Sequence, residues 1–361
     1  MTPSIELPEV KEGTLVMKNN VITITHAKMV ATRIQKDASP PVHRIRFVGC
    51  EITRWNGMDD IILGLIRDGK SAVRTLELVG MRIRESTADV ICACLKARRL
   101  RSLTLRFCEI KRANTVIGFG KIADALVDSG LVELCILDRN GRIGCVFESL
   151  PLSLEFLQID GYETMDVKYL QRILCHGKLK GLHIGFFYRD TAYWYKEDQD
   201  EFFDALSRST VEILFIDSWV MIDEFIRRGF PVGLKELHFH PTMCMRVHRI
   251  ANALLKQKKS QLRLLDVPVS TALYSRGGEE EMYTVLTEVA QQLPSLHTIT
   301  TKTNADGRLK HLIMMLHAQR VCEVLVSPSV IGRLGKNLHL PVDIMMFWLV
   351  PMMTGVNPWK Q

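Results

Sequence analysis

Apolar residues recur along the chain in one short pattern. An apolar residue is followed by two others, a second apolar residue, one more residue and a third apolar residue. The clearest copy places Leu100, Leu103 and Leu105 in these positions. The second and third apolar positions alternate with polar neighbours, which is the two-residue period of a β-strand with one buried face. Each copy therefore predicts one strand.

Eleven copies of this pattern lie between residues 42 and 326, with starts 23 to 34 residues apart and about 28 on average. Between the copies, apolar residues recur at helical spacing. Strands that alternate with helices at a short period predict a parallel sheet with helices on one side. One such unit cannot bury both of its apolar faces, so neighbouring units must stack on one another. The copies begin at Val42, Val73, Leu100, Leu131, Leu154, Leu179, Val211, Leu234, Leu262, Leu296 and Val321.

The pattern resembles the leucine-rich repeat, in the ribonuclease-inhibitor-like class that has a helix in each unit. The resemblance implies an α/β horseshoe (solenoid) of about 11 repeats, with a parallel concave sheet and helices on the convex side. We predict an N-terminal cap over residues 1–41, the solenoid over residues 42–332, and a C-terminal cap helix and tail over residues 333–361. The N-terminal cap is expected to contain strands at 14–17 and 21–25.

Charge is distributed unevenly along a chain whose composition, 47% hydrophobic and 24% charged, is typical of a globular protein. Residues 1–120 carry 20 Lys and Arg against 12 Asp and Glu, whereas the remainder carries 27 against 28. This basic excess could steer an acidic partner or nucleic acid. We favour a solvated basic face, because no Lys or Arg run is long enough for a nucleic-acid arm.

Membrane and cofactor signals are weak. No stretch approaches the roughly 18 apolar residues that span a bilayer, and the first ten residues lack the apolar segment of a signal peptide. The nine cysteines are an odd number, and their spacing does not match paired zinc ligands. We therefore expect a reducing compartment, the cytoplasm or alternatively the nucleus, with no membrane partner and no cofactor.

The residues between the apolar positions of each predicted strand should line the concave face. Read along the sheet, this face starts basic, becomes apolar and aromatic, and then turns acidic with histidines. Exposed aromatic side chains on a preformed surface are typical interface anchors, and residues 186–195 form an aromatic-rich insertion after the sixth strand. The residues that we predict to contact a partner are Arg44, Arg46, Arg106, Phe156, His183, Tyr193, Trp194, Phe215, Trp219 and His238.

Candidate catalytic chemistry is sparse. His238, His240 and Asp217 fall on neighbouring predicted strands and could hold a metal or act as a base. Two histidines on a strand face are more typical of plain surface residues, which is our interpretation. The sequence has no nucleotide-binding glycine pattern, no P-loop, no HExxH and no GxSxG motif. We predict that the chain is not an enzyme and has no small-molecule substrate.

Our main hypothesis is a non-catalytic protein–protein interaction scaffold that binds a partner protein, of unknown identity, on its concave face. A second hypothesis is a substrate-recognition subunit of a ubiquitin ligase, because residues 340–349 resemble the opening of an F-box. We favour a C-terminal cap for that segment. A third hypothesis is a regulator or inhibitor of a partner enzyme, and direct nucleic-acid binding is the weakest of the four.

Overall fold

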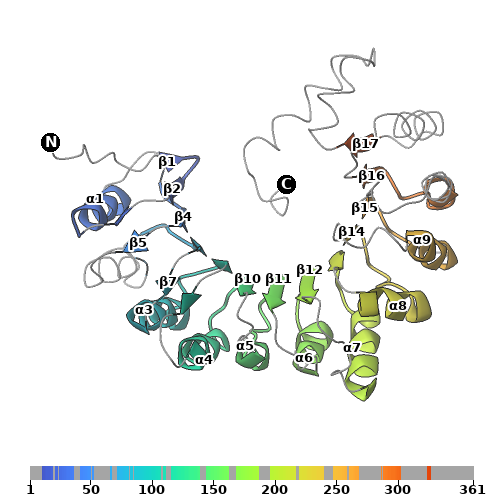
Figure 1. The fold of residues 1–361 in the computed structure, drawn as a ribbon, viewed down its shortest axis with the longest axis horizontal. Coiled ribbons are helices and arrows are strands. Elements are labelled where there is room, and N and C mark those ends of the chain that lie inside the picture. The colour runs from blue at the N-terminus through green and yellow to red at the C-terminus, as the bar shows by residue number, and fades with distance from the viewer. Residues whose placement is uncertain are drawn as a thin grey trace, which may run out of the picture.

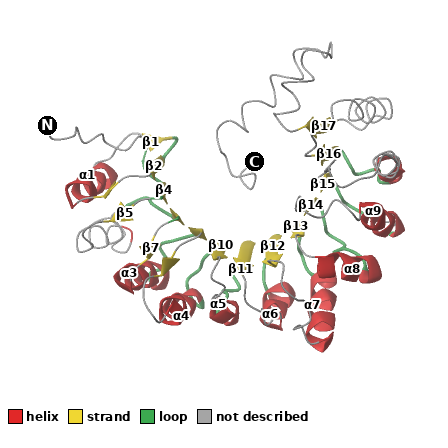
Figure 2. Ribbon diagram, viewed as in Figure 1, coloured by secondary structure: helices red, strands yellow, loops and turns green. Residues whose placement is uncertain are grey.

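Strands and helices alternate along an arc in the computed structural model, with the strands on the inside and the helices on the outside (Figures 1 and 2). The structure describes part of the 361-residue chain. The described residues are 10–18, 21–22, 24–35, 41–49, 51–52, 66, 71–80, 82–83, 85–106, 109–110, 115–138, 144–161, 168–186, 196–216, 219–239, 247–257, 260–267, 286, 288–301 and 323–326.

One open sheet of 13 strands runs the length of the arc. After the antiparallel β1–β2 pair, every strand pairs in parallel with the next one in chain order. All eleven predicted strands are present, which confirms the predicted parallel sheet. The strands are β1 (Val10–Lys11), β2 (Thr14–Lys18), β4 (Arg44–Val48), β6 (Thr75–Val79), β8 (Ser102–Arg106), β10 (Glu133–Asp138), β11 (Phe156–Gly161), β12 (Gly181–Phe186), β13 (Ile213–Ile216), β14 (Glu236–Phe239), β15 (Leu264–Val267), β16 (Thr298–Thr301) and β17 (Glu323–Val326).

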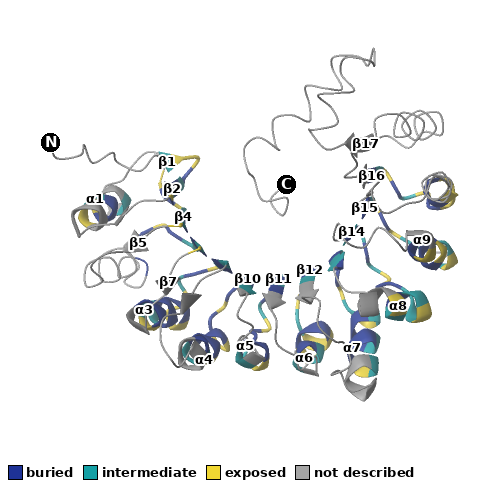
Figure 3. Cartoon of the chain, in the orientation of Figure 1, coloured by how far each residue is buried: buried dark blue, intermediate teal, exposed yellow. Residues whose placement is uncertain are grey.

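Helices cover one face of this sheet. The apolar positions of the strands, such as Leu103 and Leu105, are buried between sheet and helices. Most of the alternating residues, such as Thr104 and Arg106, are partly exposed on the other face, although Asp266 is buried. The helices turn their buried residues toward the strands and their exposed residues outward (Figure 3). The described helices are α1 (Ile24–Gln35), α3 (Glu85–Lys96), α4 (Thr115–Leu126), α5 (Gly144–Glu148), α6 (Lys168–His176), α7 (Lys196–Arg208), α8 (Trp219–Arg228) and α9 (Val247–Lys256).

The N-terminal region differs from the prediction. The β-branched run at 21–25 was expected to form one strand, but β3 (Val21–Ile22) is short and α1 begins at Ile24. Apolar residues at helical spacing, including the buried Val30 and Ala31, favour the helix. β2 pairs in register with β4, so the described part of the region predicted as a cap continues the main sheet.

A tight turn with positive φ follows two of the strands. Gly49 (φ 58°) comes after β4 and Gly80 (φ 62°) after β6, a backbone conformation that glycine adopts without steric cost. The amide of Gly49 donates to the carbonyl of Val79, and that of Gly80 to the carbonyl of Arg106, both at 2.8 Å. These turns lead into β5 (Glu51–Ile52) and β7 (Arg82–Ile83), which form two small parallel pairs, β5 with β3 and β7 with β9 (Glu109–Ile110).

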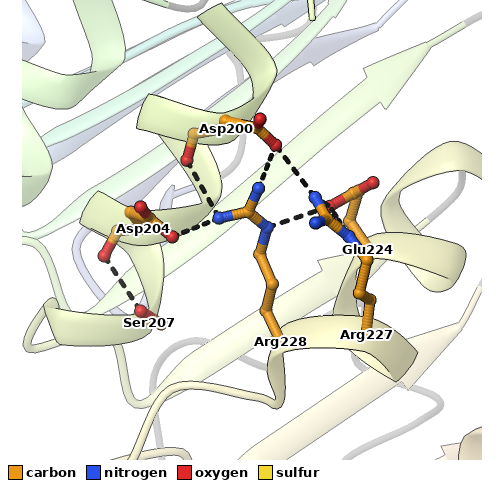
Figure 4. A network of polar contacts seen from close by, with 6 residues as sticks. All are labelled: Asp200, Asp204, Ser207, Glu224, Arg227 and Arg228. Atoms are coloured by element: carbon orange, nitrogen blue, oxygen red, sulfur yellow. Dashed lines mark hydrogen bonds and ion pairs between the residues drawn. The ribbon is translucent and has the colours of Figure 1, made fainter. Parts of the chain in front are cut away.

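Charged side chains join α7 to α8 on the outer side of the sheet. Figure 4 shows the Arg228 guanidinium lying between Asp200 and Asp204 of α7 and Glu224 of α8. Arg227 also reaches Asp200, at 2.9 Å. The Arg228 side chain is 16% exposed, so the three carboxylates compensate for much of its lost hydration. The network fixes one helix against the next.

Truncation of a core leucine tests the buried layer between sheet and helices. Leu134 of β10 is buried, whereas Leu152 lies in the turn before β11 and is exposed. We expect Leu134→Ala to lower the free energy of unfolding by about 3 kcal/mol, because it leaves a cavity. Leu152→Ala should change it by less than about 0.5 kcal/mol. Urea unfolding measures both, and equal losses would contradict the assigned layers.

Thiol reactivity tests the burial of α3 independently. Burial, reinforced by the nearby Asp89 carboxylate, raises the pKa of Cys92 to about 11, whereas Cys175 of α6 is exposed. Because the thiolate is the reactive form, we expect iodoacetamide at neutral pH to modify Cys175 well before Cys92. Peptide mass spectrometry of the native chain reads out the order. Equal rates would show that α3 is not packed as described.

Candidate functional site

The inner face of the arc is organised in rows that cross the strands. Consecutive strands pair without a shift, so residues at equivalent positions lie side by side. We call the middle one the central row. It runs through Arg46, Glu77, Thr104, Cys135, Gln158, His183, Phe215, His238 and Asp266.

The basic end of this face is a cluster of three side chains. Nε of Arg44 lies 3.3 Å from one carboxylate oxygen of Glu77, and Nε of Arg46 lies 3.3 Å from the other. The Glu77 side chain is only 18% exposed. Glu77 therefore orients both guanidinium groups and neutralises part of their charge.

A shallow groove, open to solvent, starts at this cluster and follows the inner face across the strands as far as β11. Arg44 and Glu77 line one end, Arg106 the middle, and Phe156 with Gln158 the other end. The groove thus leads from charged to aromatic surface.

Hydrogen bonds connect the middle of the central row. Gln158 Oε1 accepts from the Arg106 guanidinium at 3.4 Å and from the Cys135 thiol at 3.2 Å. The amide nitrogen of Gln158 therefore faces His183, 2.9 Å from Nδ1, and donates to it. This bond assigns the proton of a neutral His183 ring to Nε2. The side chains are fixed by one another before any partner binds.

Three stacked rings continue the row. Phe215 of β13 lies between His183 of β12 and His238 of β14, with ring centroids 5.1 Å and 4.1 Å away. The interplanar angles are 27° and 8°, so both faces of the phenyl ring are covered by imidazoles. A ring buried in such a stack presents its edge, rather than its face, to anything that approaches the sheet.

His238 lies between two carboxylates at the acidic end of the face. Nδ1 is 3.4 Å from Asp266 of β15, and Nε2 is 3.5 Å from Glu236 of its own strand. Burial lowers the pKa of His238, but the hydrogen bonds to Asp266 and Glu236 outweigh it, and the net shift is upward.

Most of the predicted partner-binding residues lie on the inner face. Arg44 and Arg46 are on β4, Arg106 on β8, Phe156 on β11, His183 on β12, Phe215 on β13 and His238 on β14. Trp219 is the first residue of α8, although the position of its side chain is not described. Tyr193 and Trp194 lie outside the described residues, as do Asp217, His240 and the segment 340–349.

The sequence did not reveal how these residues contact one another. Glu77 was expected on this face, but its pairing with both arginines was missed. Arg46 and Glu77 occupy the same position in neighbouring repeats, and this correspondence could have indicated the ion pair. Among the described residues, no group of three His, Cys, Asp or Glu side chains could hold a metal ion. No helix in the described ranges is long and apolar enough to cross a membrane.

Comparison with models of protein families gives no match, and comparison with curated proteins gives none either.

The pairing of His238 predicts a pH-dependent contribution to stability. Its pKa in the folded chain lies above the ordinary value of 6.5. The stabilisation is therefore fully present below about pH 6.5 and is lost as pH rises through the folded pKa. We expect the difference in unfolding free energy between the wild type and His238→Gln to be larger at about pH 6 than at about pH 9.

Urea unfolding of both proteins at each pH gives this difference, from which contributions common to the two cancel. A difference that stays constant, or that grows toward high pH, would contradict the described contacts with Asp266 and Glu236.

Proposed function

We propose that this chain is a leucine-rich repeat protein of the ribonuclease-inhibitor-like class, a horseshoe of about 11 repeats with a cap at each end. In this proposal it acts as a non-catalytic scaffold whose concave face binds a partner protein. The alternation of one parallel strand with one helix, repeated about every 28 residues, supports the class. The arrangement of side chains on the inner face supports the function.

The central row is the observation that carries the proposal. Its side chains form a continuous series of hydrogen bonds and ring stacks from Gln158 to Asp266, and Arg106 of the adjacent row joins this series at Gln158. Ordering a flexible side chain on binding costs roughly 0.5–1.5 kcal/mol. Because these side chains already hold one another, little of that cost remains when a partner docks. An ordered, partly exposed row with aromatic members is typical of an interface centre.

The same row favours protein over nucleic acid as the partner. Proteins that bind single-stranded nucleic acids stack the bases on exposed aromatic rings. Both faces of the Phe215 ring are instead covered by histidines. Glu77 neutralises part of the charge of Arg44 and Arg46, and the carboxylates Glu236 and Asp266 would repel phosphates. A protein surface that offers apolar contacts and complementary charges fits this face better.

Affinity capture with matched variants tests the proposal. Tagged wild-type chain is incubated with extract of the cells that express it, beside Phe156→Ala/Phe215→Ala and the control Val232→Ala. Val232 is 65% exposed in the turn between α8 and β14, away from the inner face. We expect the wild type and the control to retain the same partner, and the double variant to lose about ten-fold or more of it, because it lacks both ring anchors.

Thermal unfolding of all three proteins separates loss of binding from loss of fold. A partner that stays equally bound to a folded Phe156→Ala/Phe215→Ala variant would reject the concave face as the binding surface.

A further inference from the structure

The inner face has opposite charge at its two ends. The strands β2 to β10 carry four basic side chains on this face, Lys18, Arg44, Arg46 and Arg106, against Glu77 and Glu133. From β11 onward, the inner-face positions of the described strands contain Asp160, Glu236, Asp266 and Glu323 but neither Lys nor Arg. A surface divided in this way favours a ligand with the reverse division of charge.

The two arginine side chains at the basic end are oriented so that they can bind carboxylates. Arg44 and Arg46 each contact Glu77 through Nε. Within the described part of the chain, no hydrogen bond joins the terminal nitrogens of Arg44 or Arg46 to another residue. Those nitrogens form the fork that binds a carboxylate at two points. Glu77 thus approaches both groups most closely at Nε and leaves their terminal nitrogens without a hydrogen bond, as a carboxylate of an acidic partner would need.

An apolar stretch separates the two ends. Phe156 on β11, Ile213 on β13 and the edge of Phe215 lie between the arginine cluster and the acidic strands. Gly181 lies between Phe156 and Ile213 in their row and adds no side chain. Apolar side chains of a partner would therefore meet apolar surface at the middle of the sheet.

The strand order gives the length of such a partner segment. Eight steps separate β4 from β15 in the sheet. Since neighbouring strands lie about 4.8 Å apart, the distance is roughly 38 Å along the sheet. An extended chain that rises about 3.3 Å per residue covers it with roughly 12 residues.

We propose that the concave face binds a bipolar protein segment that crosses the strands. Its acidic residues lie over Arg44, Arg46 and Arg106, its apolar residues over Phe156 and Phe215, and its basic residues over Glu236 and Asp266. This inference rests on the proposed scaffold function and adds the chemistry and orientation of the partner.

Selection from a random peptide library tests the inference without a known partner. Random 16-residue peptides displayed on phage are panned on the immobilised 361-residue chain. Enriched peptides should carry acidic residues toward one end, basic residues toward the other and apolar residues between, in either chain direction. Two variants then locate each end of the peptide.

The first variant, Arg44→Glu/Arg46→Glu/Glu77→Arg, reverses the charge of the cluster but keeps its internal ion pairs, so that it can fold. We expect this variant to bind the enriched peptides about ten-fold or more weakly than the wild type. Replacing the acidic residues of the peptide by Lys should restore the affinity.

The second variant, Glu236→Lys, should also bind the same peptides more weakly. Only replacement of the basic residues of the peptide by acidic ones should restore this affinity. Lys256→Glu, at the exposed end of α9, is the matched control and should leave the dissociation constant within about two-fold.

Two results would overturn the inference in distinguishable ways. Peptides that lose binding to Phe215→Ala, yet show no order of charge or no response to the two reversals, would reject the bipolar segment and leave the concave binding surface intact. If no enriched peptide responds to Phe215→Ala or to either reversal, the concave face is not the binding surface and the proposed function fails as well.

Discussion

The unshifted parallel register of the main sheet is the constraint on which the rest of the structure depends. Side chains alternate between the two faces of a strand, so a slip of one residue would move every buried leucine to the open face. The buried layer prevents that slip, because Leu103, Leu134 and Leu157 must all face the helices at once. The same register that closes the core also aligns the polar rows on the other side.

The inner face is consequently more ordered than a list of exposed residues indicates. In an isolated strand Gln158 or His183 would be a flexible surface residue. Stacked in register, each lies beside a hydrogen-bonding or aromatic neighbour from the adjacent strand. The helices contribute indirectly: ion pairs such as those of Arg228 with α7 fix the outer layer, which holds the spacing of the strands below. The unshifted register of the strands therefore produces both the packing of the core and the order of the inner face.

Sequence patterns predicted the sheet well and the contacts on it poorly. The two-residue alternation around Leu105 or Ile136 identifies a strand and its buried face without further information. The N-terminal helix α1 was missed because the β-branched residues before it favoured a strand. Placement of Arg44, Phe215 and His238 on one face followed from spacing. The pairing of Glu77 with two arginines and the ring stack depend on side-chain rotamers, which a repeat pattern does not encode.

The ion-pair network of the outer helices shows the same limit. Glu224 and Arg228 are four residues apart on α8, a spacing that is visible in the sequence. The partners of Arg228 on α7, Asp200 and Asp204, are 28 and 24 residues away and meet it only because the two units stack. Local pairs can therefore be read from spacing, whereas pairs between units need the packing of one helix on the next.

The most direct measurement is a crystal structure of the chain in complex with its captured partner. We expect partner atoms to cover the central row from Gln158 to Asp266, with the His183–Phe215–His238 stack retained beneath them. A partner seated on the outer helices, with that row left open to solvent, would contradict the assignment of the inner face as the working surface.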